Sequence, residues 1–177
     1  MANVRDWRIA LIEAHPGLFH PPAGYPQKAS GYPWCHEGWR DLLERLCVRI
    51  EAALYAGETI LVVEIKEKFA SLRCYWCGDV SRDTAAKIIE AVALAQARSA
   101  CTCEQCGEPG HLYRHGGIYM TRCTTHANGV EVPPERGREN VHLVRRSLGT
   151  SDVYYARYDR ESDSFTEVPP PSPGSEE

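Results

Sequence analysis

Two short stretches, Cys103-Glu-Gln-Cys106 and Cys123-Thr-Thr-His126, decide the fold of this chain. In each stretch two residues separate the possible ligands, so the backbone can curl and both side chains can reach one ion. Residues 111–122, between the two pairs, are expected to form two short strands that turn at Gly116-Gly117. This hairpin would bring the second pair back beside the first. The sequence therefore predicts a zinc ribbon in which Cys103, Cys106, Cys123 and His126 hold one Zn²⁺.

The predicted metal site has no open coordination position. Three thiolates, one neutral imidazole and the dication give a net charge of about −1, which is typical of a structural rather than a catalytic site. The choice of ligands leaves alternatives, because Cys101 can compete for the first corner and His111 or His115 can replace His126. Buried apolar cysteines are a second interpretation. Disulfides are disfavoured, because the sequence opens without a secretory pattern and a reducing cytoplasm is the expected location.

Length and composition are those of an ordinary globular protein. The chain has 177 residues, of which 43% are hydrophobic and 25% charged, enough for one core with an appendage. No apolar run has the length of a membrane span, so no membrane association is expected. The formal net charge of −4 provides no overall basic field that would attract nucleic acid.

Residues 1–100 are expected to form an α+β core. A short helix is predicted between Val4 and Phe19, followed by an irregular segment of prolines, glycines and aromatics at residues 20–34 whose rings cap the core. The most regular pattern follows Gly38 and predicts a helix up to Gly57. A further helix is expected from about residue 81 or 83 to 99, leading directly into the ribbon.

Two strands are predicted between these helices, over residues 59–66 and 69–76, with Lys66-Glu67-Lys68 forming or flanking the turn. The second strand contains Cys74-Tyr-Trp-Cys77, which has the spacing of a second ligand pair or a redox motif. Residues three apart in a strand point to opposite faces, so we favour the strand, while a second site stays open. The segment at Lys66 and Lys68 is either a turn or a contact for a partner.

Residues 129–168 are expected to form an extension that contains strands, and residues 169–177 a disordered tail rich in proline, serine and acid. The predicted strands cover residues 141–146, 153–158 and 164–168, and the last two would pair as a hairpin. Tyr154, Tyr155 and Arg157 fit either a partner-binding surface or a small sheet packed on the core. The complete prediction is an α+β fold with two core helices on a small antiparallel sheet, a zinc ribbon at residues 101–128, and the β-containing extension.

Three blocks of this sequence resemble a group of small tailed-phage and prophage zinc-ribbon proteins. The blocks are Gly38-Trp39 with Leu46-Cys47, then Lys66-Glu-Lys-Phe69 with Leu72-Arg73, and Cys103-Glu-Gln-Cys-Gly-Glu-Pro-Gly110 with Arg122-Cys-Thr-Thr-His-Ala127. The resemblance spans residues 10–127 and implies a phage or mobile-element origin and a metal-ligand role for the four ribbon residues, but it implies no established activity. Cys35 and Cys47 match cysteines of the group, whereas Cys74 and Cys77 replace aromatic or apolar residues.

Three classes of function follow. The first is a phage-encoded accessory protein or host-directed, anti-defence inhibitor that binds a macromolecular partner, most simply a protein, in stoichiometric amounts. The second is a nucleic-acid-binding ribbon, in which Arg114 and Arg122 would contact phosphates. The third, an enzyme, is not expected, because no catalytic constellation or small-molecule site is visible. The residues expected to contact a partner are Lys66, Lys68, Arg114, Arg122, Tyr154, Tyr155 and Arg157.

Overall fold

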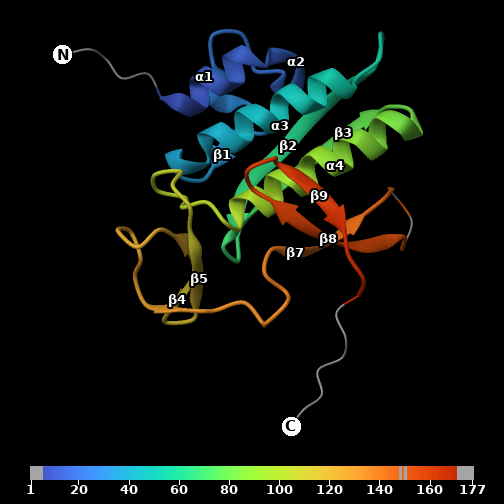
Figure 1. Ribbon diagram of the computed structural model, residues 1–177. Coiled ribbons are helices and arrows are strands. Elements are labelled where there is room, and N and C mark those ends of the chain that lie inside the picture. The colour runs from blue at the N-terminus through green and yellow to red at the C-terminus, as the bar shows by residue number, and fades with distance from the viewer. Residues whose placement is uncertain (1–5, 148, 150, 171–177) are drawn as a thin grey trace, which may run out of the picture.

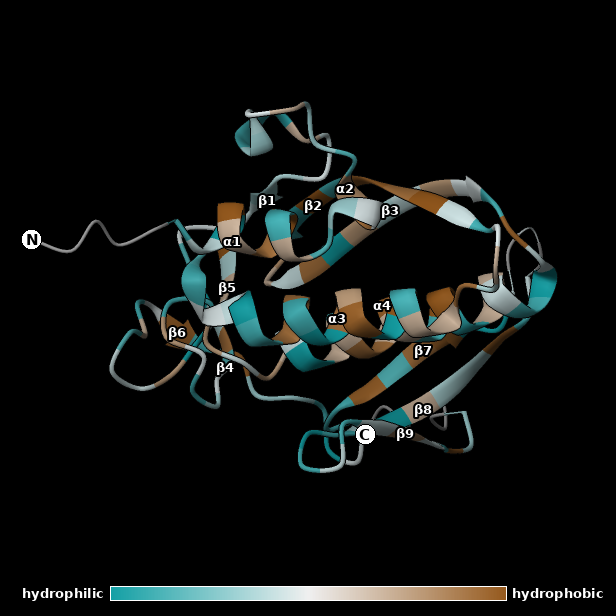
Figure 2. Ribbon diagram, turned by 90° about the horizontal axis from the view of Figure 1, so that it is seen from above, coloured by the Kyte–Doolittle hydropathy of each residue, from teal (hydrophilic) through white to brown (hydrophobic). Residues whose placement is uncertain are grey.

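A layer formed by two helices separates two sheets. The computed structural model describes residues 6–147, 149 and 151–170, and in these residues four α-helices accompany three three-stranded sheets. Helices α3 (Arg40–Ala53) and α4 (Arg82–Ser99) form the middle layer, with strands β1 to β3 on one side and β7 to β9 on the other (Figures 1 and 2). The prediction of a mixed helix and sheet fold is confirmed. None of the described helices is long and apolar enough to cross a membrane.

The apolar spacing of α3 produces the main core. Leu42, Leu43, Leu46 and Ile50 recur on one face of the helix and are buried, as the sequence predicted. Helix α4 begins at Ser81, whose hydroxyl accepts a hydrogen bond from the Thr84 N–H at 3.2 Å, in the expected capping position. The two helices pack on one face of the first sheet, and the main core lies between them.

The first sheet has the order β1-β2-β3. Strand β1 (Pro33–Trp34) runs parallel to β2 (Thr59–Lys68), and β2 pairs with β3 (Ser71–Asp79) in antiparallel fashion. The turn between β2 and β3 is Phe69-Ala70, and both residues have positive φ (52° and 63°). The observed second strand therefore begins two residues later than predicted. Lys66 and Lys68 lie at the end of β2 and flank the turn, which is one of the two expected placements.

The strand interpretation of Cys74 and Cys77 is confirmed. Both residues lie in β3, where Cys74 is buried in the core and Cys77 is exposed. Because they face opposite sides of the sheet, they do not form a second ligand pair.

The N-terminal segment departs from its prediction in two places. The expected single helix is divided into α1 (Trp7–Ala14) and α2 (Pro16–Phe19), because Pro16 cannot continue a hydrogen-bonded helix. The Pro-rich segment is not wholly irregular, since it contains a 3₁₀ turn (Pro26–Lys28) and strand β1. Its rings were expected to cap the core, and Tyr32 packs there, but Trp34 is 70% exposed.

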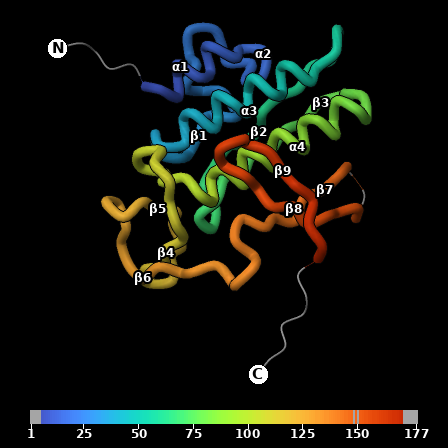
Figure 3. The backbone as a smooth tube through the Cα atoms, viewed as in Figure 1, coloured from blue at the N-terminus to red at the C-terminus, as the bar shows by residue number. Residues whose placement is uncertain are grey.

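The ribbon hairpin has the predicted form. Strands β4 (His111–His115) and β5 (Ile118–Arg122) pair across the Gly116-Gly117 turn, and the short β6 (Val130–Glu131) adds to the other edge of β4. The tube in Figure 3 shows this sheet beside the junction of α3, α4 and the first sheet. The order β5-β4-β6 leaves β5 at an edge.

The extension forms the third sheet from β7 (Val141–Arg145), β8 (Val153–Asp159) and β9 (Ser164–Glu167). The predicted hairpin of the last two strands is confirmed. Of the predicted disordered tail, residues 171–177 lie outside the described residues. Tyr158 of β8 is buried against Leu94 and Ala97 of α4, which attaches the sheet to the helix layer.

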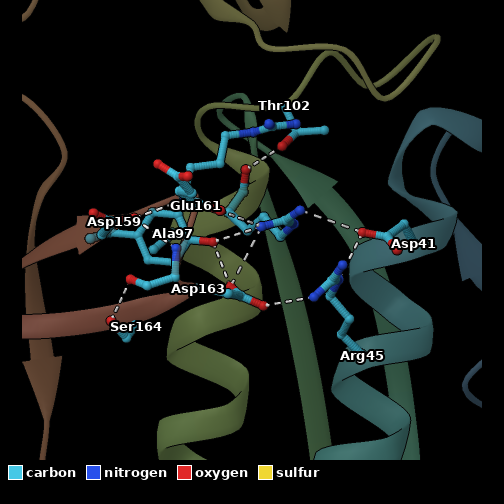
Figure 4. Close-up of polar contacts among 12 residues, drawn as sticks. Asp41, Arg45, Ala97, Thr102, Asp159, Glu161, Asp163 and Ser164 are labelled. Atoms are coloured by element: carbon cyan, nitrogen blue, oxygen red, sulfur yellow. Dashed lines mark hydrogen bonds and ion pairs between the residues drawn. The ribbon is translucent and has the colours of Figure 1, made fainter.

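A buried carboxylate fixes the extension to both helices (Figure 4). Asp163, in the β8–β9 turn with a side chain only 6% exposed, lies 2.9 Å from the Arg49 guanidinium, 3.6 Å from that of Arg45 and 3.7 Å from that of Arg98. The Tyr158 hydroxyl donates a hydrogen bond to the same carboxylate at 2.5 Å. Helices α3 and α4 and the turn of the extension therefore share one charged network.

We expect Asp163→Ala to lower the free energy of unfolding by about 2–4 kcal/mol, because Arg49 loses its counter-ion and the buried Tyr158 hydroxyl loses its acceptor. Arg98 and Arg45 keep Asp41 as a partner. Urea denaturation followed by circular dichroism measures the loss, and limited proteolysis should show faster cleavage in residues 141–167. Glu44→Gln is the control, since Glu44 forms an exposed pair with Arg40 and should cost less than about 1 kcal/mol. Equal stability of both variants would contradict the assignment.

Candidate metal centre

Four side chains from the two predicted stretches converge. The ligand atoms of Cys103, Cys106, Cys123 and His126 all lie within 4.8 Å of one another. The Cys106 and Cys123 sulfurs are 3.7 Å apart, and His126 Nδ1 lies 3.3 Å from the Cys123 sulfur and 3.7 Å from that of Cys103. A disulfide needs about 2.0 Å between sulfurs, so these thiols are not paired covalently. The four atoms can hold one metal ion.

The alternative ligands lie elsewhere. The Cys101 thiol donates to the Arg98 carbonyl oxygen at 3.3 Å, and His111 Nδ1 lies 3.6 Å from a Glu131 carboxylate oxygen. His115 is exposed at the end of β4. None of these three side chains belongs to the cluster, so the structure favours the ligand set expected from the sequence.

The first ligand pair lies on a tight backbone loop. The Gly107 N–H donates to the Cys103 carbonyl at 2.8 Å, and the Cys103 N–H donates to the Glu108 carbonyl at 2.7 Å. Gly107 has φ +82°, a conformation that side-chain-bearing residues rarely adopt. On the second pair, the His126 N–H donates to the Cys123 carbonyl at 3.1 Å. These bonds hold each pair in the curled conformation that its spacing predicted.

The thiols differ in acidity before any metal is considered. Burial alone would raise the pKa of Cys123. Hydrogen bonds from the backbone N–H of His126 and with the side chains of Cys106 and His126 outweigh burial and lower this pKa to about 6. For Cys106 the Glu108 N–H lowers the pKa, yet burial and the contacts with Cys103 and Cys123 raise it to about 11. A bound cation would favour the thiolate form of its cysteine ligands.

A buried ion pair joins the two ligand stretches. Glu104 follows the first ligand and Arg122 precedes the third, and their side chains meet at 3.0 Å while only 8% and 12% exposed. The other Glu104 carboxylate oxygen accepts the His36 N–H at 3.1 Å. Arg122, expected to contact a partner, is therefore occupied inside the protein, and Glu104 is a contributor that the sequence analysis missed. The residues around Glu104 in the sequence gave no indication that its side chain pairs with Arg122, 18 residues along the chain.

The start of α3 packs directly on the first loop. The Gly38 N–H donates to the Glu104 carbonyl at 2.8 Å, and the Trp39 indole N–H donates to the Thr102 carbonyl at 3.0 Å. A methyl group at Gly38 would collide with the Cys103 and Glu104 carbonyl oxygens. Only glycine permits this approach, which gives a physical reason for the Gly38-Trp39 motif.

The extension also contacts this loop. Arg160, in the β8–β9 turn, donates to the Gly107 carbonyl at 3.2 Å. Arg98 of α4 donates to the Arg160 carbonyl at 3.0 Å, which continues into the Asp163 network. The candidate metal centre therefore lies at the junction of the helix layer, the ribbon hairpin and the extension.

The remaining cysteines do not form a second centre in the described chain. Burial raises the pKa of Cys35 and of Cys74 to about 12, and it also raises that of Cys47. Cys35 and Cys47 belong to the main core. These thiols stay protonated at neutral pH and act as apolar packing groups.

The other residues expected to contact a partner are distributed over three sheets. Lys66 and Lys68 lie on β2, Arg114 on β4, and Tyr154, Tyr155 and Arg157 on β8. Arg157 donates to the Glu139 and Gly137 carbonyls, and Arg146 stacks on Tyr154 at 4.0 Å. Tyr154 and Arg157 thus have partners within the extension, whereas Arg114 and Lys68 are exposed.

No protein-family model, curated protein or solved structure matches this chain.

We expect Cys106→Ser and Cys123→Ser each to abolish binding of the single metal ion, because three remaining ligands cannot complete the tetrahedral set. Metal content measured by mass spectrometry of the intact protein should fall from one ion to none. Cys101→Ser is the matched control and should keep the ion, since a serine hydroxyl can donate to the same carbonyl. If only the Cys101 variant lost the metal, Cys101 would replace Cys103 in the ligand set.

We expect Gly38→Ala to destabilise the protein by about 1–3 kcal/mol and to weaken metal retention, because the new methyl group must displace the ligand loop. Thermal melting with and without a chelator measures both effects. Gly17→Ala is the control, since a methyl group there meets no atom within 4 Å. A Gly38 variant that melts and holds metal like the control would show that the loop tolerates displacement.

Proposed function

We propose that this protein is a zinc-stabilised binding protein that acts by stoichiometric attachment to a macromolecular partner, in the first place another protein. The observation that carries the proposal is the closed ligand set. Three sulfurs and one imidazole nitrogen can complete a tetrahedron around one ion, which would leave no position for a substrate. An ion so enclosed stabilises the arrangement of the elements around it.

Zinc is the metal that this ligand set fits best. With bonds of about 2.3 Å to sulfur and 2.0–2.1 Å to nitrogen, a tetrahedron has edges of about 3.8 Å between sulfurs and about 3.5 Å between sulfur and nitrogen. Of the six separations among the four ligand atoms, three agree with these lengths, at 3.7 Å between sulfurs and 3.3 and 3.7 Å from sulfur to nitrogen, and all six lie within 4.8 Å. Thiolate-rich sites also favour zinc over magnesium or calcium.

Exposed apolar side chains near the centre support a binding role. Trp34, Phe69 and Ile118 are 70%, 71% and 67% exposed. Large apolar groups gathered on a surface are typical of interaction sites, and tryptophan is enriched among the residues that dominate binding energy. The role of a phage-encoded accessory or host-directed inhibitor rests on the motif resemblance over residues 10–127.

Nucleic-acid binding is the second candidate, because one observation favours it. Arg114 and Tyr119 lie opposite each other on β4 and β5, both exposed, as a cation beside a ring that can stack on a base. The net charge of −4 opposes high affinity at physiological salt.

A pull-down with zinc-loaded protein from bacterial lysate, with and without nuclease, tests the proposal. A protein partner that resists nuclease and then co-elutes from size exclusion with the purified chain in a fixed ratio would support it. Recovery of nucleic acid, with loss of all protein partners after nuclease treatment, would replace it with the second candidate.

We expect the double charge reversal Lys66→Glu and Lys68→Glu to weaken attachment of that partner while the melting temperature stays nearly unchanged. Both lysines are at the surface, where Lys66 forms an exposed pair with Glu64 at 2.7 Å and lies 5.8 Å from the centre of the Tyr75 ring. The control is Lys87→Glu on α4, where Lys87 also forms an exposed pair, with Asp83. A drop in melting temperature that matches the loss of binding would make the Lys66 segment structural.

A further inference from the structure

A pocket of about 540 Å³ separates two edge strands next to the metal centre. Strand β1 contributes Trp34 on one side, and β5 contributes Ile118 and Tyr119 on the other. The Glu104–Arg122 ion pair, which joins the two ligand stretches, also lines the pocket. We call this feature the edge pocket.

The two strand edges beside the pocket differ. The outer carbonyls of β1 are occupied, since the Arg8 guanidinium donates to Pro33 at 3.0 Å and to Cys35 at 2.5 Å. In the β4–β5 hairpin the two-residue turn makes His115 and Ile118 the first hydrogen-bonded pair, so the alternate residue Tyr119 directs its N–H and C=O away from β4. Thr121, two residues on, confirms this direction, because its carbonyl accepts the Glu104 N–H at 3.2 Å.

The backbone of Tyr119 is therefore open. Within residues 6–147, 149 and 151–170, neither its N–H nor its C=O has a backbone or side-chain hydrogen-bond partner. An edge strand with free donors and acceptors is a template for another strand. A peptide backbone is the chemistry that complements it, through the strand addition seen in many peptide-binding domains.

Apolar side chains surround this edge. Trp34 and Ile118 are exposed on both sides of the edge pocket, and Trp34 also lines a second hollow of about 460 Å³ with Val63 and Tyr75. The Phe69-Ala70 turn adjoins β5, since the Thr121 hydroxyl donates to the Ala70 carbonyl at 2.8 Å. The pocket can accept one large side chain of an added strand.

The charged groups that line the edge pocket balance, with Glu67 and Glu104 against Arg8 and Arg122, so the preference for an acidic ligand comes from cations on the neighbouring strands. Glu67 and Glu104 already accept hydrogen bonds, from the Ala70 N–H at 2.6 Å and from Arg122 at 3.0 Å. In the described part of the chain, the exposed or half-buried cations Lys68, Arg73 and Arg114 have no carboxylate partner. Arg73 lies opposite Lys66, which lies opposite Trp34, across the three strands of the first sheet. Arg114 lies opposite Tyr119.

We propose that the outer edge of β5 and the edge pocket bind an extended acidic segment of a protein partner, which adds a strand beside Tyr119 and inserts one aromatic or large aliphatic side chain next to Trp34. The inference rests on the proposed function and names the chemistry of its partner. The acidic residues of the segment face Lys68, Arg73 and Arg114.

The test uses random twelve-residue peptides displayed on yeast and sorted against the fluorescent, zinc-loaded full-length protein. Selected peptides are synthesised, and their dissociation constants are measured by fluorescence anisotropy. We expect sequences with one aromatic or large aliphatic residue between Asp and Glu, affinity that falls with added salt, and protection of the Tyr119 amide from hydrogen exchange.

Trp34→Ala should weaken peptide binding at least about tenfold, as expected for loss of an anchoring tryptophan. Ile118→Ala should weaken it less. Leu143→Ala is the matched control, because Leu143 is 59% exposed on the third sheet and its loss should leave affinity unchanged. Melting temperatures close to that of the unmodified protein confirm that each variant folds.

The proposal is overturned if no peptide is selected, if selected peptides bind the Trp34 variant as tightly as the parent, or if protection lies away from β5. It is also overturned if a labelled oligothymidine or a second copy of the chain occupies this surface in a Trp34-dependent way. A lysate partner that is retained by the Trp34 variant would leave the proposed function intact while removing this surface from it. If peptides are selected at this surface but no partner is recovered from lysate, the edge pocket would remain a peptide site and the proposed function would lose its support.

Discussion

The close approach of Gly38 to the loop that contains Cys103 and Cys106 is the constraint on which the rest of the structure depends. At this point the backbone of the α3 entrance touches the backbone of a ligand loop, with no side chain between them. The Trp39 indole adds a buried hydrogen bond to Thr102, and Arg160 contacts Gly107 on the same loop. Two separate parts of the chain, the α3 entrance and the β8–β9 turn, therefore contact one loop, which carries two of the four candidate metal ligands.

The structure uses two kinds of long-range link. The ligand cluster joins residues 103 and 126 through one candidate ion site, while Glu104 with Arg122 and Asp163 with its arginines join elements through buried charge. Buried ion pairs add little net stability, because removing charges from water offsets most of the attraction. Their directional hydrogen bonds instead select one arrangement of otherwise similar surfaces. This is a physical reason for an acidic residue in a turn that the sequence presented as an ordinary hairpin loop.

The parts of the fold that were predictable are those with local causes. The helix after Gly38, the strand containing Cys74 and the hairpin at Gly116-Gly117 each follow from spacing and turn chemistry within a few residues. The ligand set could also be predicted, because the two ligands of each pair are close in sequence. Only the contact between the two pairs is long-range. Glu104 and Asp163 could not be assigned, since their partners lie on distant elements. Trp34 was expected to cap the core, because composition alone does not distinguish a ring that covers the core from one that flanks an open edge.

The position of the β5 edge links binding to the metal. Tyr119 lies four residues before Cys123, and the intervening Thr121 and Arg122 hold the strand to the Phe69-Ala70 turn and to Glu104. An edge held in this way has already lost the conformational freedom that a flexible strand would lose on binding, which favours affinity without added contacts. If the ion holds Cys123 in place, it also holds the register of β5. Metal binding and strand addition then stabilise the same conformation, so each should strengthen the other by the same factor.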